Sequence, residues 1–280
     1  MTEINAFTKV DLHIHTTASD GSWTPQELVA AAVRENIGII AVTDHDSVAN
    51  VEETQRLAKD AGIICLGGVE VNSTKDGNNI HVLAYGADLR NKNLRELLRH
   101  NEALMEADDV KIVAMAAAAG YAADPAEFVD YTYDRRRGGW RSLAYLIDKG
   151  VCFDVKDFFK RIYLPENQLS FPIFPAVEEV IAAIHEAGGA AVCAHAASSF
   201  HGPGLEALLE TLAEESFDGF ECYHSCHTAE GMRTLLELCR RRGYFITGGS
   251  DSHGSFTADR YLGQPEVRLQ DIYLPDIIKS

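Results

Sequence analysis

Two short segments near opposite ends of the chain place metal-ligand side chains on alternate residues. The first reads Asp11-Leu12-His13-Ile14-His15, and the second reads Gly249-Ser250-Asp251-Ser252-His253. Each follows an apolar run that predicts a buried strand, and alternate residues of an extended strand project to the same side. Neutral imidazole is a good ligand for zinc, iron and related ions. The two segments therefore predict one transition-metal centre, and a closed fold that brings them together.

Further ligand-type residues stand at or near the ends of the other predicted strands. The candidate ligands are His13, His15, Asp20, His45, Glu70, His81, His195, Asp251 and His253. A lone histidine at a strand end is usually a hydrogen-bonded structural residue, but independent structural roles on strand after strand would be a rare coincidence. One zinc ion takes only about four ligands, so two or three divalent ions (Zn, Mn or Fe) are predicted. Glu70 is the expected bridge between ions, and Asp44 is expected to orient His45.

The elements that must position these residues alternate between strands and helices. Apolar runs typical of buried strands cover residues 37–43, 63–71, 79–85, 190–194, 219–223 and 244–247. A hairpin turn is expected at 75–78, and a helix at Thr24-Pro25. Residues 94–187 read as mostly helical, with prolines as breaks. Because parallel strands joined by helices present functional groups at their C-terminal ends, we predict a barrel domain from 1–93 and 188–280 with a helical insertion or cap domain at 94–187.

Composition and charge narrow the class of partner. No apolar run approaches the roughly 20 residues that cross a bilayer, and the N-terminus has neither a basic lead nor an apolar signal core. We therefore expect a cytoplasmic protein with no membrane partner. The net charge of -17 argues against a broad basic surface for duplex nucleic acid. It does not exclude an anionic substrate, because bound cations reverse the local field.

The motifs together resemble a known family. DLHIHTTASDGSWTPQELV, AVTDHDS, GVEVN, IHVLAYG, AH at 194–195 and GSDSHG are similar to the PHP (polymerase and histidinol phosphatase) superfamily, and more narrowly to its stand-alone phosphoesterases. The resemblance covers residues 9–90 and 190–255 and implies a distorted (β/α)7 barrel with two or three metals at its C-terminal mouth. By this resemblance one ion takes His13, His15, Glu70 and Asp251, a second shares Glu70 with His81 and His195, and a third takes Asp20, His45 and His253.

Such a centre predicts hydrolysis of phosphate esters. Metals about 3.5–4 Å apart lower the pKa of a bridging water and clamp the oxygens of a phosphoryl group. We predict a metal-bridging hydroxide as nucleophile, with no covalent enzyme intermediate. The expected substrate is a small phosphorylated metabolite or nucleotide: a phosphomonoester, with nucleotides, nucleoside bisphosphates or short oligonucleotides favoured.

An arginine is the expected clamp for the outer phosphate oxygens, because its planar fork is bidentate. The dense basic run of the helical insertion is Asp134-Arg135-Arg136-Arg137-Gly138-Gly139-Trp140-Arg141, where family members commonly show Arg-Pro-His. We assign Arg137 and Arg141 to catalysis and Arg135 to substrate contact. The alternative is a solvated insertion surface.

Histidines beyond the metal set could move a proton. His224 and His227 follow the sixth predicted strand and are expected at the barrel mouth. His227 is favoured as the residue that contacts substrate or protonates the leaving oxygen, a normal task for imidazole. His224 and His201, which follows His195 by a short loop, are further substrate-contact candidates.

Two other readings compete with a phosphoesterase. A polynuclear barrel could be an amidohydrolase-type enzyme for a non-phosphate bond, although no lysine stands at these strand ends to be carboxylated. The chain could also be a non-catalytic regulatory PHP module, although all ligand positions are filled.

Overall fold

A curved sheet of eight strands forms the centre of the protein, in a computed structural model that describes residues 4–198 and 204–275. The strand order is β7-β6-β5-β4-β3-β2-β1-β8. The strands are β1 (Lys9–Asp11), β2 (Ile37–Val42), β3 (Ile64–Lys75), β4 (Asn78–Tyr85), β5 (Ala190–Cys193), β6 (Gly219–His224), β7 (Phe245–Gly249) and β8 (Val267–Arg268). The sheet is parallel except where β4 and β8 join it, since β4 is antiparallel to both β3 and β5. The expected hairpin turn joins β3 to β4 at Asp76-Gly77, both with positive φ.

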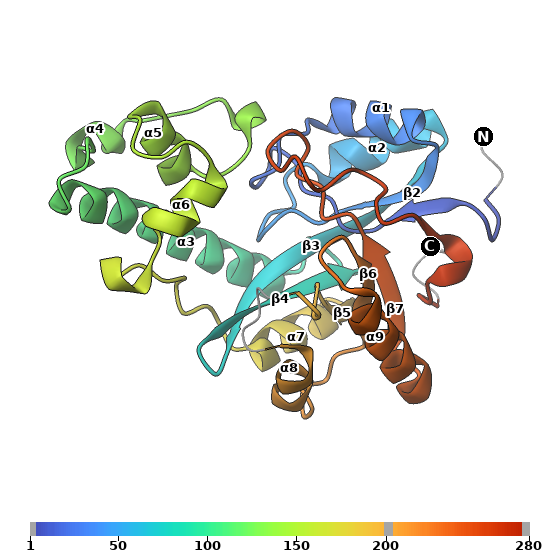
Figure 1. The fold of residues 1–280 in the computed structure, drawn as a ribbon. Helices are drawn as coiled ribbons and strands as arrows, with labels where there is room; N and C mark the ends of the chain where they lie inside the picture. The colour runs from blue at the N-terminus through green and yellow to red at the C-terminus, as the bar shows by residue number, and fades with distance from the viewer. Residues whose placement is uncertain (1–3, 199–203, 276–280) are drawn as a thin grey trace.

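The sheet curls until β1 approaches β7, which gives a nearly closed, distorted barrel (Figure 1). The Leu12 N–H donates to the Gly248 carbonyl at 3.1 Å, and the Asp251 N–H donates to the His13 carbonyl at 2.8 Å. Gly249 permits this approach, because a Cβ there would lie 2.4 Å from the His13 nitrogen. The two ligand-bearing segments from opposite ends of the sequence are therefore neighbours.

Helices cover the outside of the barrel. They are α1 (Pro25–Arg34), α2 (Val51–Ala61), α7 (Val177–Glu186), α8 (Leu205–Thr211) and α9 (Ala229–Arg242). The start of α1 follows the prediction: Thr24 is the N-cap, Pro25 is the first helical residue, and Glu27 completes a capping box. One apolar core lies inside the barrel and includes Leu12 and Tyr85, while others lie between sheet and helices.

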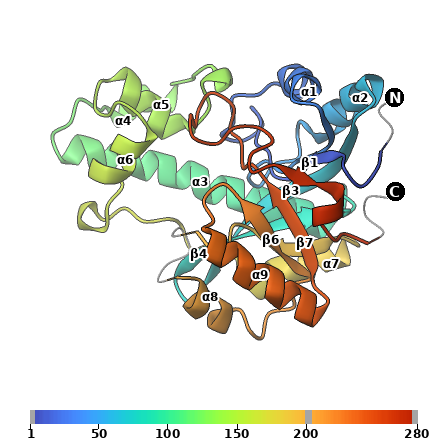
Figure 2. The same ribbon diagram turned by 45° about the vertical axis from the view of Figure 1, so that its right-hand side comes forward.

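A helical lobe stands beside the barrel (Figures 1 and 2). It contains α3 (Lys92–Ala118), α4 (Pro125–Val129), α5 (Arg141–Asp148), α6 (Val155–Arg161) and the short 3-10 turns η1 (Arg135–Arg137) and η2 (Pro165–Asn167). The long helix α3 belongs to both parts, because Leu94 packs in a core between the sheet and its covering helices, and Val113 packs in the core of the lobe. Helix α7 packs on β3, β4 and β5.

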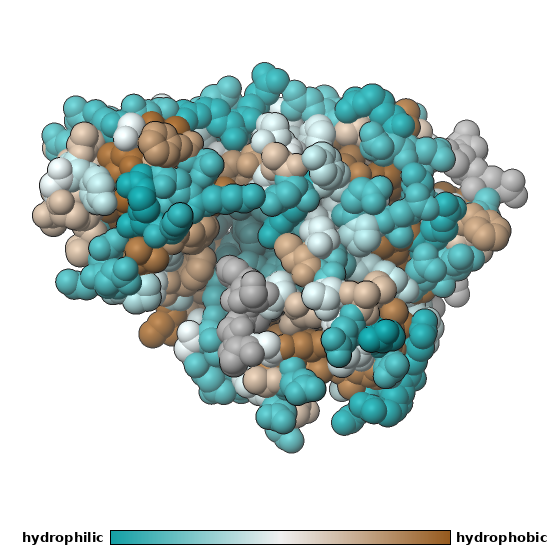
Figure 3. Space-filling view, in the orientation of Figure 1, coloured by the Kyte–Doolittle hydropathy of each residue, from teal (hydrophilic) through white to brown (hydrophobic). Residues whose placement is uncertain are grey.

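The short strand β8 was not predicted, because two residues are too few to show an alternating pattern. Across the described part of the chain, no helix combines the length and the apolar character needed to cross a membrane. Figure 3 shows the surface hollowed between the helical lobe and the barrel, with hydrophilic residues around the hollow.

Candidate metal centre

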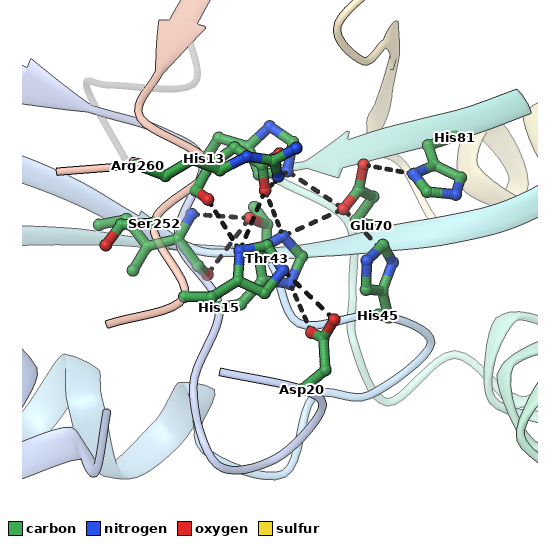
Figure 4. A network of polar contacts seen from close by, with 12 residues as sticks. His13, His15, Asp20, Thr43, His45, Glu70, His81, Ser252 and Arg260 are labelled. Carbon is green, nitrogen blue, oxygen red and sulfur yellow. Dashed lines mark hydrogen bonds and ion pairs between the residues drawn. The ribbon is translucent and has the colours of Figure 1, made fainter. Parts of the chain in front are cut away.

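The nine predicted ligands converge at the mouth of the barrel. Figure 4 labels His13, His15, Asp20, His45, Glu70 and His81 among them. His13 and His15 follow β1, His45 follows β2, His195 follows β5, and Asp251 and His253 follow β7, while Asp20 lies in the loop before α1. Glu70 and His81 differ from the expectation for strand ends: they lie within β3 and β4, because these strands continue past the mouth as a hairpin.

Glu70 is the central residue of this cluster. Its Oε2 lies 3.1 Å from Nε2 of both His13 and His15. Its Oε1 lies 3.0 Å from Nδ1 of His81 and 3.1 Å from Nε2 of His195. Each carboxylate oxygen therefore faces a different pair of imidazoles.

Two aspartates complete the ring of carboxylates. Asp251 Oδ1 lies 3.0 Å from Nε2 of His15, and Asp20 Oδ2 lies 3.3 Å from Nε2 of His253. His45 lies close both to Glu70 and to the group of Asp20 and His253. Its Nδ1 is 3.3 Å from Glu70 Oε2. The donor atoms fall into overlapping groups within 4.8 Å of one another: His13, His15, Glu70 and Asp251; His15, Asp20, His45 and His253; and His45, Glu70 and His81.

The chemistry of this cluster fits divalent cations. Both ring nitrogens of His15 and Nδ1 of His45 are buried without a hydrogen-bond partner among the described residues. Burial lowers the pKa of His15, but the Asp251 and Glu70 carboxylates, 3.0 and 3.1 Å from its Nε2, outweigh burial and raise that pKa to about 10. Buried carboxylates next to these imidazoles require a compensating positive charge. Divalent cations would supply that charge in place of protons on the imidazoles.

Glu221 on β6 is a site residue that the sequence analysis did not assign. His13 Nδ1 donates to Glu221 Oε1 at 3.0 Å, and the backbone N–H of His195 donates to Oε2 at 2.9 Å. This contact directs Nε2 of His13 toward Glu70, as carboxylates commonly do for metal-bound imidazole. The available signal was a single charged residue in an otherwise uncharged buried strand.

The prediction that Asp44 orients His45 was wrong. The Asp44 carboxylate accepts the backbone N–H of Thr16 at 2.7 Å and the hydroxyl of Ser19 at 2.5 Å. The hydrogen-bond partners of this carboxylate are Thr16 and Ser19, and none of its hydrogen bonds among the described residues goes to His45. Asp44 therefore fixes the loop that carries Asp20.

His224, the last residue of β6, and His227, in the loop that follows it, both have hydrogen-bond partners. His224 Nε2 lies 3.2 Å from Asp251 Oδ2, and its Nδ1 accepts the Cys226 N–H at 3.1 Å. His227 Nδ1 donates to the Cys222 carbonyl at 3.0 Å, and its Nε2 accepts the Ala197 N–H at 3.2 Å. His227 thus joins two loops of the backbone and keeps no free ring nitrogen. His201 lies outside the described residues.

The arginines of the basic run do not converge on the cluster. Arg137 makes a bidentate ion pair with Asp148, with contacts of 3.0 and 2.8 Å. Arg141 donates to backbone carbonyls at the end of α4, including that of Tyr131 at 3.0 Å. Arg135 comes nearer, and donates to the Ser19 carbonyl at 2.8 Å, in the loop next to Asp20.

Arg260, which was not singled out from the sequence, has its guanidinium at the cluster. It forms an ion pair with Asp251, and Figure 4 shows it in the polar network of the site. The signal was weak: one isolated arginine, seven residues after the last ligand, in a loop that follows a ligand-bearing strand.

Comparison with known proteins decides the family. The model of the PHP domain matches residues 11–190. The chain belongs to the PHP domain family. A 5'-3' exoribonuclease of Haemophilus influenzae is 29% identical to this PHP protein over 259 residues, which cover 88% of this chain and 90% of that one. A 3',5'-nucleoside bisphosphate phosphatase of Chromobacterium violaceum is 27% identical over 269 residues, 92% of this chain and 91% of that one.

A solved structure shares the fold of this PHP protein. It is a protein of Bifidobacterium adolescentis, provisionally described as a metal-dependent phosphoesterase, with a TM-score of 0.81, 26% identity and coverage of 95% of this chain and 94% of that one. The predicted barrel is thereby confirmed. The chain is a hydrolase of phosphate esters, and its family implies divalent metal ions. A second solved structure with this fold, 25% identical with a TM-score of 0.76 over 88% of each chain, is described as an amidohydrolase of Chromobacterium violaceum. The relatives named above are an exoribonuclease and a phosphatase.

Proposed function

We propose that this PHP phosphoesterase hydrolyses phosphomonoesters at a centre of two or three divalent ions (Zn, Mn or Fe). The observation that carries the proposal is the position of Glu70, whose two oxygens each face a different pair of imidazoles at 3.0–3.1 Å. A carboxylate shared in this way suits a bridging ligand. Bound ions would activate a water molecule and neutralise the charge of the phosphoryl group.

We propose the following ligand assignment. One ion would take His13, His15, Glu70 and Asp251, a second Glu70, His81 and His195, and a third Asp20, His45 and His253. His15 faces the first and third groups with different ring nitrogens, 3.0 Å from Asp251 and 3.6 Å from Asp20. Since a neutral imidazole offers one lone pair, Nε2 is the assigned ligand atom.

The residues around the ligands hold them in place. Glu221 orients His13, Asp44 fixes the loop of Asp20, and His224 contacts the outer oxygen of Asp251. We do not retain His227 as a proton donor, because backbone groups occupy both of its nitrogens. Nor do we retain Arg137 and Arg141 as phosphate ligands, because their guanidinium groups are used within the helical lobe.

Nucleotides, nucleoside bisphosphates or short oligonucleotides are the proposed substrates. The relatives named above act on RNA and on nucleoside bisphosphates. The net charge of -17 disfavours a long nucleic-acid track, so a short substrate fits this chain better. We further propose that residues 94–187 act as a cap beside the mouth, with Arg135 on the side of the lobe nearest Asp20.

Metal depletion and reconstitution test the proposal. Metal-free protein should lack activity on an aryl phosphate and on a nucleoside 3',5'-bisphosphate, and Mn²⁺, Fe²⁺ or Zn²⁺ should restore it. His13→Ala and Asp251→Ala should each lower kcat by more than about 100-fold, since loss of partners outside the ligand shell already costs 10- to 100-fold. Near-normal rates in both variants, or full activity without metal, would contradict the proposal.

A further inference from the structure

The metal ligands do not account for one part of a phosphoesterase site. That part is the group that binds the outer oxygens of the phosphate. In the chain as described, four of the five arginines near the mouth are committed elsewhere: Arg135 to backbone carbonyls, Arg136 to Glu27, Arg137 to Asp148 and Arg141 to backbone carbonyls. Arg260 is the one whose guanidinium contacts a candidate metal ligand.

We propose that Arg260 is the catalytic arginine that binds the phosphoryl group of the substrate, which rests on the proposed phosphoesterase function. The two oxygens of Asp251 face different partners. Oδ1 lies 3.0 Å from Nε2 of His15, on the ligand side, while Oδ2 takes the Arg260 guanidinium. The arginine is thereby held one carboxylate away from the candidate ions, which is where a phosphate bound to them would extend.

The Arg260 guanidinium has N–H donors available to bind a ligand. Arginine has five N–H donors in a planar fork. Among the described residues, the Arg260 fork contacts the Asp251 carboxylate and, weakly at 4.0 Å, the Cys226 sulfur. Nε and the remaining N–H groups have no partner there, and 29% of the side chain is exposed. These donors could form two parallel bonds to phosphate oxygens, the geometry in which arginine binds phosphate best.

The loop that carries Arg260 is fastened at both ends. At its start, the Ser255 N–H donates to the Ser22 hydroxyl at 2.7 Å. At its end, the Gly263 N–H donates to Asp11 Oδ2 at 2.7 Å, and the buried Asp11 carboxylate also accepts the Ser250 hydroxyl at 2.6 Å. A donor held in this way needs little reorganisation when charge develops on the phosphoryl oxygens.

Charge balance also favours this role. The mouth holds the carboxylates of Asp20, Glu70 and Asp251, which would repel a phosphate dianion. Metal ions would neutralise part of this charge, and Arg260 adds a cation that cannot be deprotonated at physiological pH. An arginine that only neutralised Asp251 would stabilise this candidate metal ligand without affecting the affinity for phosphate. Neutralising Asp251 and binding phosphate can therefore be distinguished by experiment.

The test compares Arg260→Gln and Arg260→Lys with wild type, and uses Arg56→Gln, an exposed arginine of α2 paired with Asp60, as the control for the charge change. Metal content is measured in each protein, together with kcat, KM and the affinity for inorganic phosphate by calorimetry. Arg260→Gln should lower kcat/KM and phosphate affinity by about 10- to 100-fold, the range for a charge-assisted bond. Arg260→Lys should keep wild-type metal content and recover only part of the affinity, because lysine lacks the fork.

Several outcomes would overturn the inference. Phosphate affinity within about twofold of wild type in Arg260→Gln would do so, as would Arg260→Lys with full phosphate affinity and full turnover. A loss of turnover that follows loss of metal alone, with normal phosphate affinity in metal-saturated protein, would show that Arg260 serves only Asp251. Calorimetry with phosphate does not require turnover, so an inactive wild type would contradict the proposed function, and phosphate binding would still test Arg260.

Discussion

At the scale of single residues, the centre is organised by carboxylates that use their two oxygens for different purposes. Glu70 divides its oxygens between two pairs of histidines. Asp251 divides its own between His15 and Arg260. Glu221 divides its own between the His13 ring and the His195 backbone, and none of its side chain is exposed. Each carboxylate therefore fixes the relative position of two groups that come from different strands.

Replacing Glu221 by Gln should weaken metal binding. Burial raises the pKa of Glu221, but the charge of His13 outweighs burial and keeps that pKa below its usual value, so the residue acts as a carboxylate. A glutamine amide can accept only through one oxygen, and its NH2 would face the His195 N–H. We expect metal affinity to fall by about 10- to 100-fold, the cost typical of partners that orient a ligand. Metal titration by calorimetry measures this directly.

Glu237→Gln, an exposed change of the same kind on α9, is the matched control for Glu221→Gln and should bind metal as wild type does. Equal metal affinity in Glu221→Gln and wild type would show that His13 needs no carboxylate to orient it.

At the scale of elements, α3 ties the helical lobe to the barrel and also caps another helix. Asp109, buried on α3, accepts the backbone N–H of Ser142 at 3.1 Å, in the first turn of α5. A carboxylate near a helix N-terminus satisfies an otherwise unpaired N–H. Burial nevertheless dominates and raises the pKa of Asp109 to about 6 from 3.8. The helical lobe therefore stabilises the protonated form of Asp109 more than water does.

Asp109 should make the stability of the protein depend on pH. Its folded pKa of about 6 is above the unfolded value of 3.8, so its stabilising contribution is complete below about pH 4 and is lost as pH rises through 6. Asp109→Asn can still accept from Ser142 but does not titrate. We expect the melting temperature of the variant relative to wild type to rise by a few degrees between pH 5 and pH 7.5.

Melting curves of the two proteins at both pH values measure this difference, and effects of the metal cluster cancel in the comparison. Asp60→Asn, an exposed change on α2, should show no such trend. A difference between Asp109→Asn and wild type that is the same at both pH values would contradict the prediction.

At the scale of the whole molecule, the candidate centre draws its donors from residues as far apart in sequence as His13 and His253. Closure of the barrel therefore forms the centre, and ions bound there should in turn stabilise the closed barrel. A ligand that binds only the folded state stabilises it by about 2.7 kcal/mol at a concentration of 100 times its Kd.

Metal should raise the melting temperature. Saturating Mn²⁺ should increase it by at least about 5 °C over metal-free protein, given 2–4 °C per kcal/mol for a chain of this size. Differential scanning calorimetry with and without chelator measures this shift. Asp251→Asn should reduce the shift, whereas Asp60→Asn should keep it. An identical melting temperature in metal-free and metal-loaded wild type would contradict a resident metal centre.

Much of the fold, and the convergence of the nine candidate ligands, could be predicted because the relevant rules are local. Alternation on a strand places His13 and His15 on one side, and strand ends in a barrel meet at one mouth. The substrate-side residues could not be predicted in the same way. Arg137 and Arg141 stand in a dense basic run, yet their guanidinium groups are used by an aspartate and by carbonyls within the lobe. Which acceptor lies nearest an arginine on an irregular segment is not encoded in the spacing of that segment.

The sequence by itself predicted the candidate ligand set opened by Asp-Leu-His-Ile-His and closed by Gly-Ser-Asp-Ser-His, together with the barrel that joins them. Only the tertiary structure decided how the remaining polar groups pair. His13 and Glu221 are 208 residues apart, Asp11 and Ser250 are 239 apart, and Asp44 pairs with Thr16 and Ser19 rather than with its neighbour His45. Ligand placement follows from the period of a strand, whereas pairing depends on distances between loops, and these are set only when the barrel has closed.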